Sequence, residues 1–199
     1  MVTSEGLFLA SLRATGALKD GHFLLSSGRH SDRYVEKFDL LRNPGATTAA
    51  CAEIAESFRD QSVDVVAGPT TGGVILAFEV ARQLGSAAAY AERAEGDGTA
   101  REFRRGTTFA SGSRVLVVDD ILTTGSSVRE TLQALAVHPV EVIAAAVLVD
   151  RSSGDLDLGT RLVSLARMTI SSWDAELCPL CAAGAPLTKP GTTPGLPTP

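Results

Sequence analysis

Residues 115–127 read VLVVDDILTTGSS and constrain the fold of this chain more than any other segment. The first four residues are apolar without polar alternation, which is typical of a strand buried on both faces. Asp119 and Asp120 follow, then a turn of small hydroxyl residues and glycine, and then a helix whose apolar residues recur at helical spacing from Val128. Such a turn offers hydroxyls, backbone N–H groups and a helix N-terminus to a phosphate, while the two acids suit sugar hydroxyls and a hard cation. The segment therefore predicts a strand–turn–helix site for a ribose 5-phosphate.

Strand and helix patterns alternate through the middle of the chain. The alternation predicts an α/β fold, with an open, mainly parallel sheet and helices on both faces. Because ligands of such sheets lie at the carboxyl ends of the strands, we expect Gly68, Asp119 and Asp150 to converge on one site. The expected elements are helices at 46–60 and 74–84, strands at 63–67, 87–91 and 142–149, a glycine-rich turn at 68–73 and a polar loop at 92–106.

The two ends of the chain differ from this middle region. Residues 1–45 are short apolar pieces interrupted by glycine and proline, and we expect them to form a small N-terminal hood over the sheet. Residues 46–175 are the expected core, and residues 176–199 are a C-terminal segment. Because the tail from Gly184 is rich in proline and glycine, we expect its last residues, about eight, to be disordered.

Residues 117–127, VVDDILTTGSS, resemble the signature of the type I phosphoribosyltransferases, enzymes that use 5-phosphoribosyl 1-diphosphate as their sugar donor. The resemblance implies that Asp119 and Asp120 hold the ribose and that the GPTTGG turn at 68–73 holds the diphosphate. On its own, GPTTGG would be interpreted as a plain strand-to-helix turn. The implied donor-binding residues are Thr71, Gly72, Arg93, Asp119, Asp120, Ile121, Leu122, Thr123, Thr124, Gly125, Ser126 and Ser127.

The reaction that the resemblance implies is displacement of diphosphate from C1 of the ribose by a ring nitrogen, through a transition state with oxocarbenium character. Stabilising the leaving diphosphate requires Mg²⁺ and cationic side chains, and the ribose must be held still. We expect Mg²⁺ to be bound mainly through the substrate, and no protein ligand is assigned to it. The implied catalytic residues are Asp119, Asp120 and Arg93. Neither acid is assigned as a proton-transfer base, because an anionic nucleobase needs none.

Two further segments resemble the orotate phosphoribosyltransferases. Residues 21–34, GHFLLSSGRHSDRY, are similar to the amino-terminal motif of that family. Residues 147–151, VLVDR, end on an arginine that corresponds to one pairing with orotate. A planar arginine suits the orotate carboxylate, although Arg151 could instead be a surface residue after a strand. The resemblance covers most of the chain, and the implied orotate contacts are Tyr34, Val35, Thr123 and Arg151.

The chain departs from many orotate enzymes in three segments. Ser26 replaces a lysine before the Ser-Gly of the first motif, and Thr71 and Gly72 replace an aromatic–lysine pair in the diphosphate turn. The loop 92–106 contains no lysine or histidine. Its nearest match to the family's first loop cation is Arg93, and the looser candidates are Arg101, Arg104 and Arg105.

The short loop and residues 178–191, CPLCAAGAPLTKPG, resemble a compact bacterial and archaeal branch of the family. In the family the loop reaches across a dimer interface into the neighbouring site. The resemblance therefore implies a homodimer with a shared active site.

Two other functions remain open from the sequence. A purine phosphoribosyltransferase would share the fold and the donor, but Arg151 and the amino-terminal motif speak against it. A non-catalytic regulator that senses phosphoribosyl diphosphate stays open because the loop lacks lysine. Such a regulator should carry a basic nucleic-acid-binding surface or an added domain, and neither is evident.

Composition narrows the partners and the compartment. A net charge of −5 without a Lys/Arg-rich stripe argues against nucleic acid as a partner. No apolar stretch approaches a membrane span and the N-terminus lacks signal-peptide features, so we expect a cytoplasmic protein without a membrane partner. Three cysteines fit a reducing compartment.

The spacing of Cys178 and Cys181 is that of half a zinc site. A structural turn is the plainer interpretation, and a zinc ion bound between subunits stays open. The other cysteine and the three histidines are too scattered along the chain to be nominated as further ligands.

Overall fold

The computed structural model describes residues 4–95, 98, 100–152 and 156–190 of the chain. The tail expected to be disordered therefore lies outside the described residues. The helices are α1 (Ser4–Ala14), α2 (Lys37–Leu41), α3 (Pro44–Glu56), α4 (Gly72–Leu84), α5 (Ser126–Leu135) and α6 (Pro179–Ala182), with a 3₁₀ turn at Ala175–Leu177. The strands are β1 (Leu18–Leu24), β2 (His30–Val35), β3 (Val65–Pro69), β4 (Ala87–Arg93), β5 (Arg101–Glu102), β6 (Ser113–Leu122), β7 (Val140–Asp150), β8 (Leu162–Arg167) and β9 (Ser172–Trp173).

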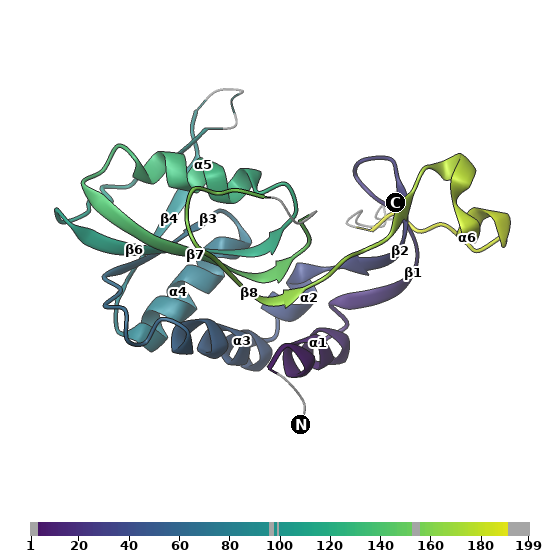
Figure 1. Ribbon diagram of the computed structural model, residues 1–199, viewed down its shortest axis with the longest axis horizontal. Helices are drawn as coiled ribbons and strands as arrows, with labels where there is room; N and C mark the ends of the chain where they lie inside the picture. The colour runs from purple at the N-terminus through teal and green to yellow at the C-terminus, as the bar shows by residue number, and fades with distance from the viewer. Residues whose placement is uncertain (1–3, 96–97, 99, 153–155, 191–199) are drawn as a thin grey trace, which may run out of the picture.

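A six-stranded sheet in the order β5-β4-β3-β6-β7-β8 forms the centre of the molecule. Every neighbouring pair is parallel except β4 with β5. Helix α5 covers one face, and α1, α3 and α4 lie on the other (Figure 1). The predicted mainly parallel α/β fold with helices on both faces is confirmed.

The apolar run before the acidic pair explains why helices pack on both faces of the central sheet. Leu116 and Val118 join the core on the α3/α4 face, while Val115 and Val117 join a second core on the α5 face, and all four side chains are fully buried. A strand that is apolar at every position can only be satisfied between two layers of helices.

The strand order reverses between β3 and β6. The connection from β3 through α4 leads outward to β4, whereas the connection from β6 through α5 leads the opposite way to β7. Ligand sites in open α/β sheets form beside such a reversal. Here the carboxyl ends of β3, β6 and β7 are neighbours, with Leu122 paired to Asp150. The structure thus brings Gly68, Asp119 and Asp150 to one edge of the sheet, as predicted.

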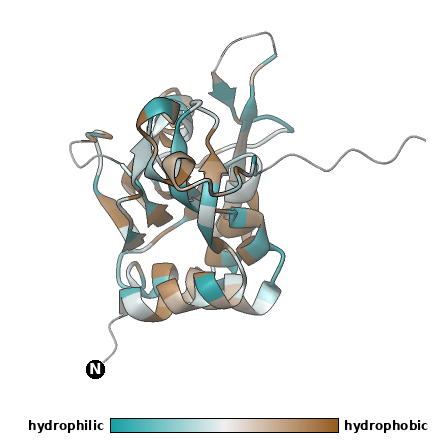
Figure 2. Ribbon diagram, turned by 90° about the vertical axis from the view of Figure 1, so that its right-hand side faces the viewer, coloured by the Kyte–Doolittle hydropathy of each residue, from teal (hydrophilic) through white to brown (hydrophobic). Residues whose placement is uncertain are grey.

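The loop expected at 92–106 is partly a strand pair, so that expectation was wrong in part. Strand β4 continues to Arg93, and β5 folds back on it with Glu92 opposite Glu102 and Arg93 opposite Arg101. The sequence did not predict this strand pair because its residues are polar. The pair is held by backbone hydrogen bonds between the strands and not by apolar burial. The resulting β4–β5 ribbon projects from the sheet and is largely hydrophilic (Figure 2).

A second, antiparallel sheet in the order β1-β2-β9 stands beside the central one, and we call it the hood sheet (Figure 1). Its last strand comes from the C-terminal part of the chain. Helix α1, from the segment expected to form the hood, instead contributes Phe8 and Leu12 to the core on the α3/α4 face. No helix in the described part of the chain has both the length and the apolar character to span a membrane.

Candidate active site

The acidic pair lies inside strand β6, not after it. Because side chains alternate along a strand, Asp119 points to the α5 side and Asp120 to the side of the hood sheet. Only 6% of Asp119 and 3% of Asp120 is exposed. Two neighbouring acids therefore belong to two different cavities at the same sheet edge.

Asp119 is the more perturbed of the two. Its Oδ1 accepts a hydrogen bond from the backbone N–H of Asp120 at 2.8 Å. Burial raises the pKa of its carboxyl from 3.8 to about 7, and the negative charge of Asp120 raises it further in the same direction. Burial therefore favours the protonated form of this side chain more than in a solvent-exposed carboxyl.

Asp120 is paired with a lysine from the hood side. The Nζ of Lys37 lies 2.9 Å from Oδ2 and donates to Oδ1 at 3.1 Å. Sequence reasoning missed Lys37. The available signal was its position, because it follows the amino-terminal motif directly and is one of three lysines in the chain.

A small cavity of about 200 Å³ opens at the N-terminus of α5. Gly125 precedes the helix with φ of +75°, a left-handed conformation that favours glycine, and a Cβ there would also press on Leu156 Cδ2 at 2.8 Å. The hydroxyls of Thr124 and Ser126 lie 3.2 Å apart at its rim. Hydroxyls and helical N–H groups that converge in this way suit a phosphate dianion. The lining residues are Asp119, Ile121, Leu122, Thr123, Thr124, Gly125, Ser126, Ser127 and Val128.

The GPTTGG turn lies against Asp120. Its Gly72 begins α4, and a Cβ at this position would overlap the Oδ2 of Asp120. The peptide bond between Thr70 and Thr71 is cis, and Thr71 is exposed at the N-terminus of α4. Glycine therefore allows the turn to approach the acid closely.

The buried side chain of Arg101 contacts this turn through Thr70. Its guanidinium donates to Thr70 Oγ1 at 3.2 Å and to the Ala91 carbonyl at 3.2 Å, and pairs with Glu130 of α5 at 3.0 Å. Only 3% of its side chain is exposed. Arg101, considered from the sequence as a loop cation, therefore connects the turn, β4 and α5.

A larger cavity of about 810 Å³ lies between the sheet edge and the hood sheet. It brings together segments that are far apart in the sequence, including all four residues expected to contact orotate. Its lining comprises Ser26, Tyr34, Val35, Glu36, Lys37, Phe38, Arg42, Asp120, Ile121, Thr123 and Arg151.

Arg151 is a half-buried cation of this cavity. Its Nε is buried and has no acceptor among the residues that the structure describes. Burial lowers the pKa of its guanidinium, and burial followed by the charge of Glu36 raises the pKa of the neighbouring Tyr34. A buried donor without a partner destabilises the empty site, so an anionic acceptor is expected here.

The loop cations line neither cavity, although Arg101 contacts the adjacent turn. Arg93 is exposed at the end of β4 and lines neither of the two cavities. Arg104 pairs with Glu95 and Arg105 with Glu92 on the β4–β5 ribbon. Of the residues expected to bind the donor, Arg93, Thr71 and Gly72 line neither cavity, although Thr71 and Gly72 belong to the turn beside Asp120.

Three comparisons with known proteins agree with this geometry. A family model described as phosphoribosyl transferase domain matches residues 39–175, more than half of the chain. The orotate phosphoribosyltransferase of Caldicellulosiruptor bescii is 43% identical over 189 residues, which are 95% of this chain and 98% of that protein. That of Pelotomaculum thermopropionicum is 44% identical over 184 residues, 92% of this chain and 95% of that protein. The crystal structure of orotate phosphoribosyltransferase from Aeropyrum pernix superposes with a TM-score of 0.68 at 33% identity, covering 81% of this chain and 93% of that one.

Proposed function

This chain belongs to the orotate phosphoribosyltransferases of the phosphoribosyl transferase family, and we propose that the two cavities at its sheet edge hold the two substrates of that reaction. The reaction transfers the 5-phosphoribosyl group from 5-phosphoribosyl 1-diphosphate to orotate. It yields orotidine 5′-monophosphate and diphosphate in pyrimidine biosynthesis.

The observation that supports the orotate subsite best is the buried Nε of Arg151. It lines the cavity with Tyr34 and Val35 and lacks an acceptor in the described part of the chain. The orotate carboxylate can accept from two guanidinium N–H groups in one plane. A purine has no carboxylate and would leave this donor unsatisfied.

The sugar donor spans both cavities. We assign its 5-phosphate to the cavity at the α5 N-terminus, formed by residues 121–128. Its ribose hydroxyls then lie between Asp119 and Asp120, and its diphosphate lies towards Thr71 and Gly72. This arrangement uses every donor-binding residue predicted from the sequence except Arg93.

The two acids stabilise the transition state by position and charge. Positive charge develops on the ribose as the C1–O bond to diphosphate breaks, and the neighbouring carboxylates favour that charge. Lys37 compensates Asp120 in the free protein, and 35% of its side chain is exposed. It can therefore turn from Asp120 towards an incoming anion.

Mg²⁺ remains part of the proposal. The oxygen atoms at this edge, the carboxylates and the hydroxyl of Thr123, are of the type that Mg²⁺ prefers. Because Lys37 already pairs with Asp120 and Asp119 accepts a backbone N–H, the chain supplies few uncommitted ligands. This fits an ion held mainly by the donor's diphosphate, whose negative charge it neutralises.

A homodimer with a shared site would explain the position of Arg93. The surface of α3 and α4 supports this part of the proposal, since 65% of Phe78 and 39% of Ile75 are exposed beside an apolar hollow of about 420 Å³. An exposed apolar surface of this kind marks a contact. Mixing Arg93→Ala with Asp119→Asn/Asp120→Asn protein should restore activity if Arg93 acts across the interface, and no recovery after subunit exchange would contradict that role.

We also propose the cytoplasm as the compartment and small molecules as the substrates. Cys51, Cys178 and Cys181 form no disulfide in the part of the chain that the structure describes, which fits a reducing compartment. A net charge of −5 gives no general attraction to a nucleic acid backbone or an anionic membrane.

The test is consumption of orotate. Purified protein is mixed with Mg²⁺ and phosphoribosyl diphosphate, and orotate absorbance is followed beside matched reactions with adenine, hypoxanthine, guanine, xanthine and uracil. We expect rapid turnover of orotate alone. Turnover of a purine would overturn the role of Arg151. Donor binding without any turnover would favour a regulator.

A further inference from the structure

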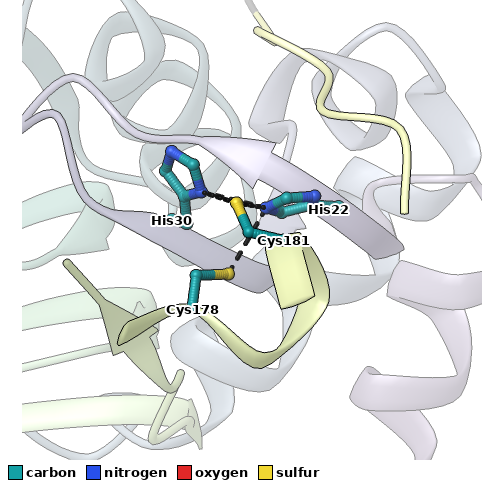
Figure 3. A group of neighbouring side chains, drawn as sticks. All are labelled: His22, His30, Cys178 and Cys181. Carbon is teal, nitrogen blue, oxygen red and sulfur yellow. Dashed lines mark hydrogen bonds between the residues drawn. The ribbon is translucent and has the colours of Figure 1, made fainter. Parts of the chain in front are cut away.

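Four metal-ligating side chains meet beside the hood sheet (Figure 3), and none of them lines the two cavities described above. His22 lies in β1 and His30 in β2. Cys178 directly precedes the short helix α6, and Cys181 lies within that helix. One ligand atom of each residue lies within 4.8 Å of all the others. Strand pairing brings together residues that are 156 positions apart in the chain.

The spacing of the atoms is that of a tetrahedral site. His22 Nε2 lies 3.0 Å from His30 Nδ1, 3.4 Å from Cys178 Sγ and 3.7 Å from Cys181 Sγ, and Cys181 Sγ lies 3.2 Å from His30 Nδ1. A zinc ion with Zn–N of about 2.0 Å and Zn–S of about 2.3 Å holds its ligands roughly 3.3–3.8 Å apart. These four separations thus lie within a few tenths of an ångström of the tetrahedral values, and the other two are at most 4.8 Å.

Backbone contacts orient the ligands for this purpose. His22 Nδ1 lies 2.9 Å from the carbonyl of Ala185, to which it can donate only as the N–H tautomer. That tautomer leaves the lone pair of Nε2 directed at the other three ligands. A second hydrogen bond of this type is typical of zinc-bound histidine.

Burial also favours a bound cation. The exposed fraction is 5% for His22, 6% for His30 and 3% for Cys178, whereas Cys181 is exposed and offers an entry path. Two thiols and two imidazoles face one another here, and a metal ion would give all four a shared partner.

We propose that His22, His30, Cys178 and Cys181 bind one structural zinc ion, which fastens the C-terminal segment onto the β1–β2 hairpin. Four protein ligands leave no open position, so the site is closed to water and substrate. Thiolate with imidazole favours zinc over Mg²⁺ or Ca²⁺, which prefer oxygen. The half-site suggested by the cysteine spacing is thus completed within one chain, not between subunits.

The ion would also support the nucleobase cavity. Strand β2 begins at His30 and ends at Val35, beside Tyr34. Around the ion, Thr188 pairs with Phe23, and its N–H donates to the carbonyl of His22 at 2.8 Å. The ion therefore fixes the first residue of β2, while the last residues of the same strand line the nucleobase cavity.

The first experiment measures metal content. Protein is expressed with zinc in the medium, purified without chelators and analysed by inductively coupled plasma mass spectrometry. We expect about one zinc per chain in the wild type, as for a closed four-ligand site. Cobalt-substituted protein should show the visible bands of tetrahedral Co²⁺ with thiolate-to-cobalt charge transfer.

The variants identify the ligands. Cys181→Ala alters an exposed side chain and should fold, yet lose the metal and the cobalt spectrum. Cys51→Ala, at the cysteine outside the group, is the matched control and should keep both. A chelator should lower the melting temperature of the wild type and of Cys51→Ala but not that of Cys181→Ala.

Three results would overturn the proposal. These are wild-type protein without stoichiometric zinc and without a cobalt spectrum, equal zinc in wild type and Cys181→Ala, and a Cys178–Cys181 disulfide in freshly purified protein by thiol counting. None of these readouts depends on turnover. The zinc proposal and the proposed activity can therefore fail independently of each other.

Discussion

The central sheet and the hood sheet are stabilised by different kinds of contact. In β6 and β7 most buried positions are valine, leucine or alanine, on both faces, and the buried acids Asp119, Asp120 and Asp150 lie towards the carboxyl ends. In the hood sheet the buried positions include His22, His30 and Ser31. Fully burying an aliphatic side chain contributes about 1.5–3 kcal/mol, whereas a net hydrogen bond contributes about 0.5–1.5 kcal/mol. The central sheet can thus hold buried acids at its edge, while the hood sheet combines a few apolar residues, Leu18, Phe23 and Val35, with buried polar contacts.

The largest effect is expected where the central sheet carries its acids. Asp119→Asn with Asp120→Asn removes the charge that favours the oxocarbenium ion, and kcat/KM for the donor should fall by about 100-fold or more. The melting temperature should stay constant or rise, because two buried carboxylates no longer repel each other. Steady-state kinetics test the loss of kcat/KM, and thermal unfolding tests the melting temperature. A marked loss of stability would show that the central sheet depends on its acids, contrary to the comparison of the two sheets.

Arg151 lies where the two sheets meet, so its loss should affect one substrate only. Removing a charged hydrogen bond in Arg151→Ala should raise KM for orotate by about 10- to 100-fold. KM for the donor should change little. Arg59→Ala, at an exposed ion pair with Glu56, is the matched control. Equal effects on both substrates would remove Arg151 from the orotate subsite.

A smaller effect concerns packing within the central part. In Gly72→Ala the added methyl group would overlap Asp120, which should destabilise the fold by about 1–3 kcal/mol and weaken donor binding. In Gly45→Ala the new Cβ would lie 3.6 Å from Asn43 Oδ1, an ordinary contact. That control should be neutral or stabilising by about 0.5–1 kcal/mol. Urea unfolding measures the free energy of unfolding of both variants. If Gly72→Ala is as stable as Gly45→Ala, the turn can move away from Asp120.

The buried acid should also give the central part a dependence on pH. The pKa of Asp119 is about 7 in the folded state against 3.8 ordinarily, so between these values the folded state keeps a proton that the unfolded chain has released. Stability from this group is therefore lost as pH rises, by roughly 1 kcal/mol per pH unit, up to about pH 7. Asp119→Asn should gain stability relative to wild type from pH 5 to pH 7 in urea unfolding, and a constant difference would contradict the shift.

The smallest effect is expected in the hood sheet. Arg29 donates to Ser172 Oγ at 3.0 Å, to the Ser172 carbonyl at 2.7 Å and to Asp174 at 2.6 Å, but 41% of its side chain is exposed. Arg29→Ala should cost about 1 kcal/mol or less with metal bound. The loss of melting temperature should be larger after chelation. Calorimetry that finds the same loss in both states would mean that the ion and Arg29 act independently.

Prediction from the sequence succeeded where the information was contiguous. The apolar run, the acids and the turn at 115–127 determine one strand and one helix start, so their arrangement needed no distant partner. Lys37 was missed because its partner Asp120 is 83 positions away. His22 and His30 were missed for the same reason, since only the hairpin register and α6 bring them to the cysteines. Arg101 was placed in a loop because the pairing of β4 with β5 has no apolar pattern.

The pleat of β6 makes the length of that strand as important as its composition. The pairing of β6 with β7 already shifts register between Val115 and Leu116, so one residue is accommodated outside the regular ladder there. A single insertion or deletion between that point and Asp119 would turn each acid to the opposite side of the sheet. The carboxylate now beside the cavity at the N-terminus of α5 would then face Lys37, and the other would face α5. Homologous chains should therefore tolerate substitutions in this stretch more readily than changes in its length.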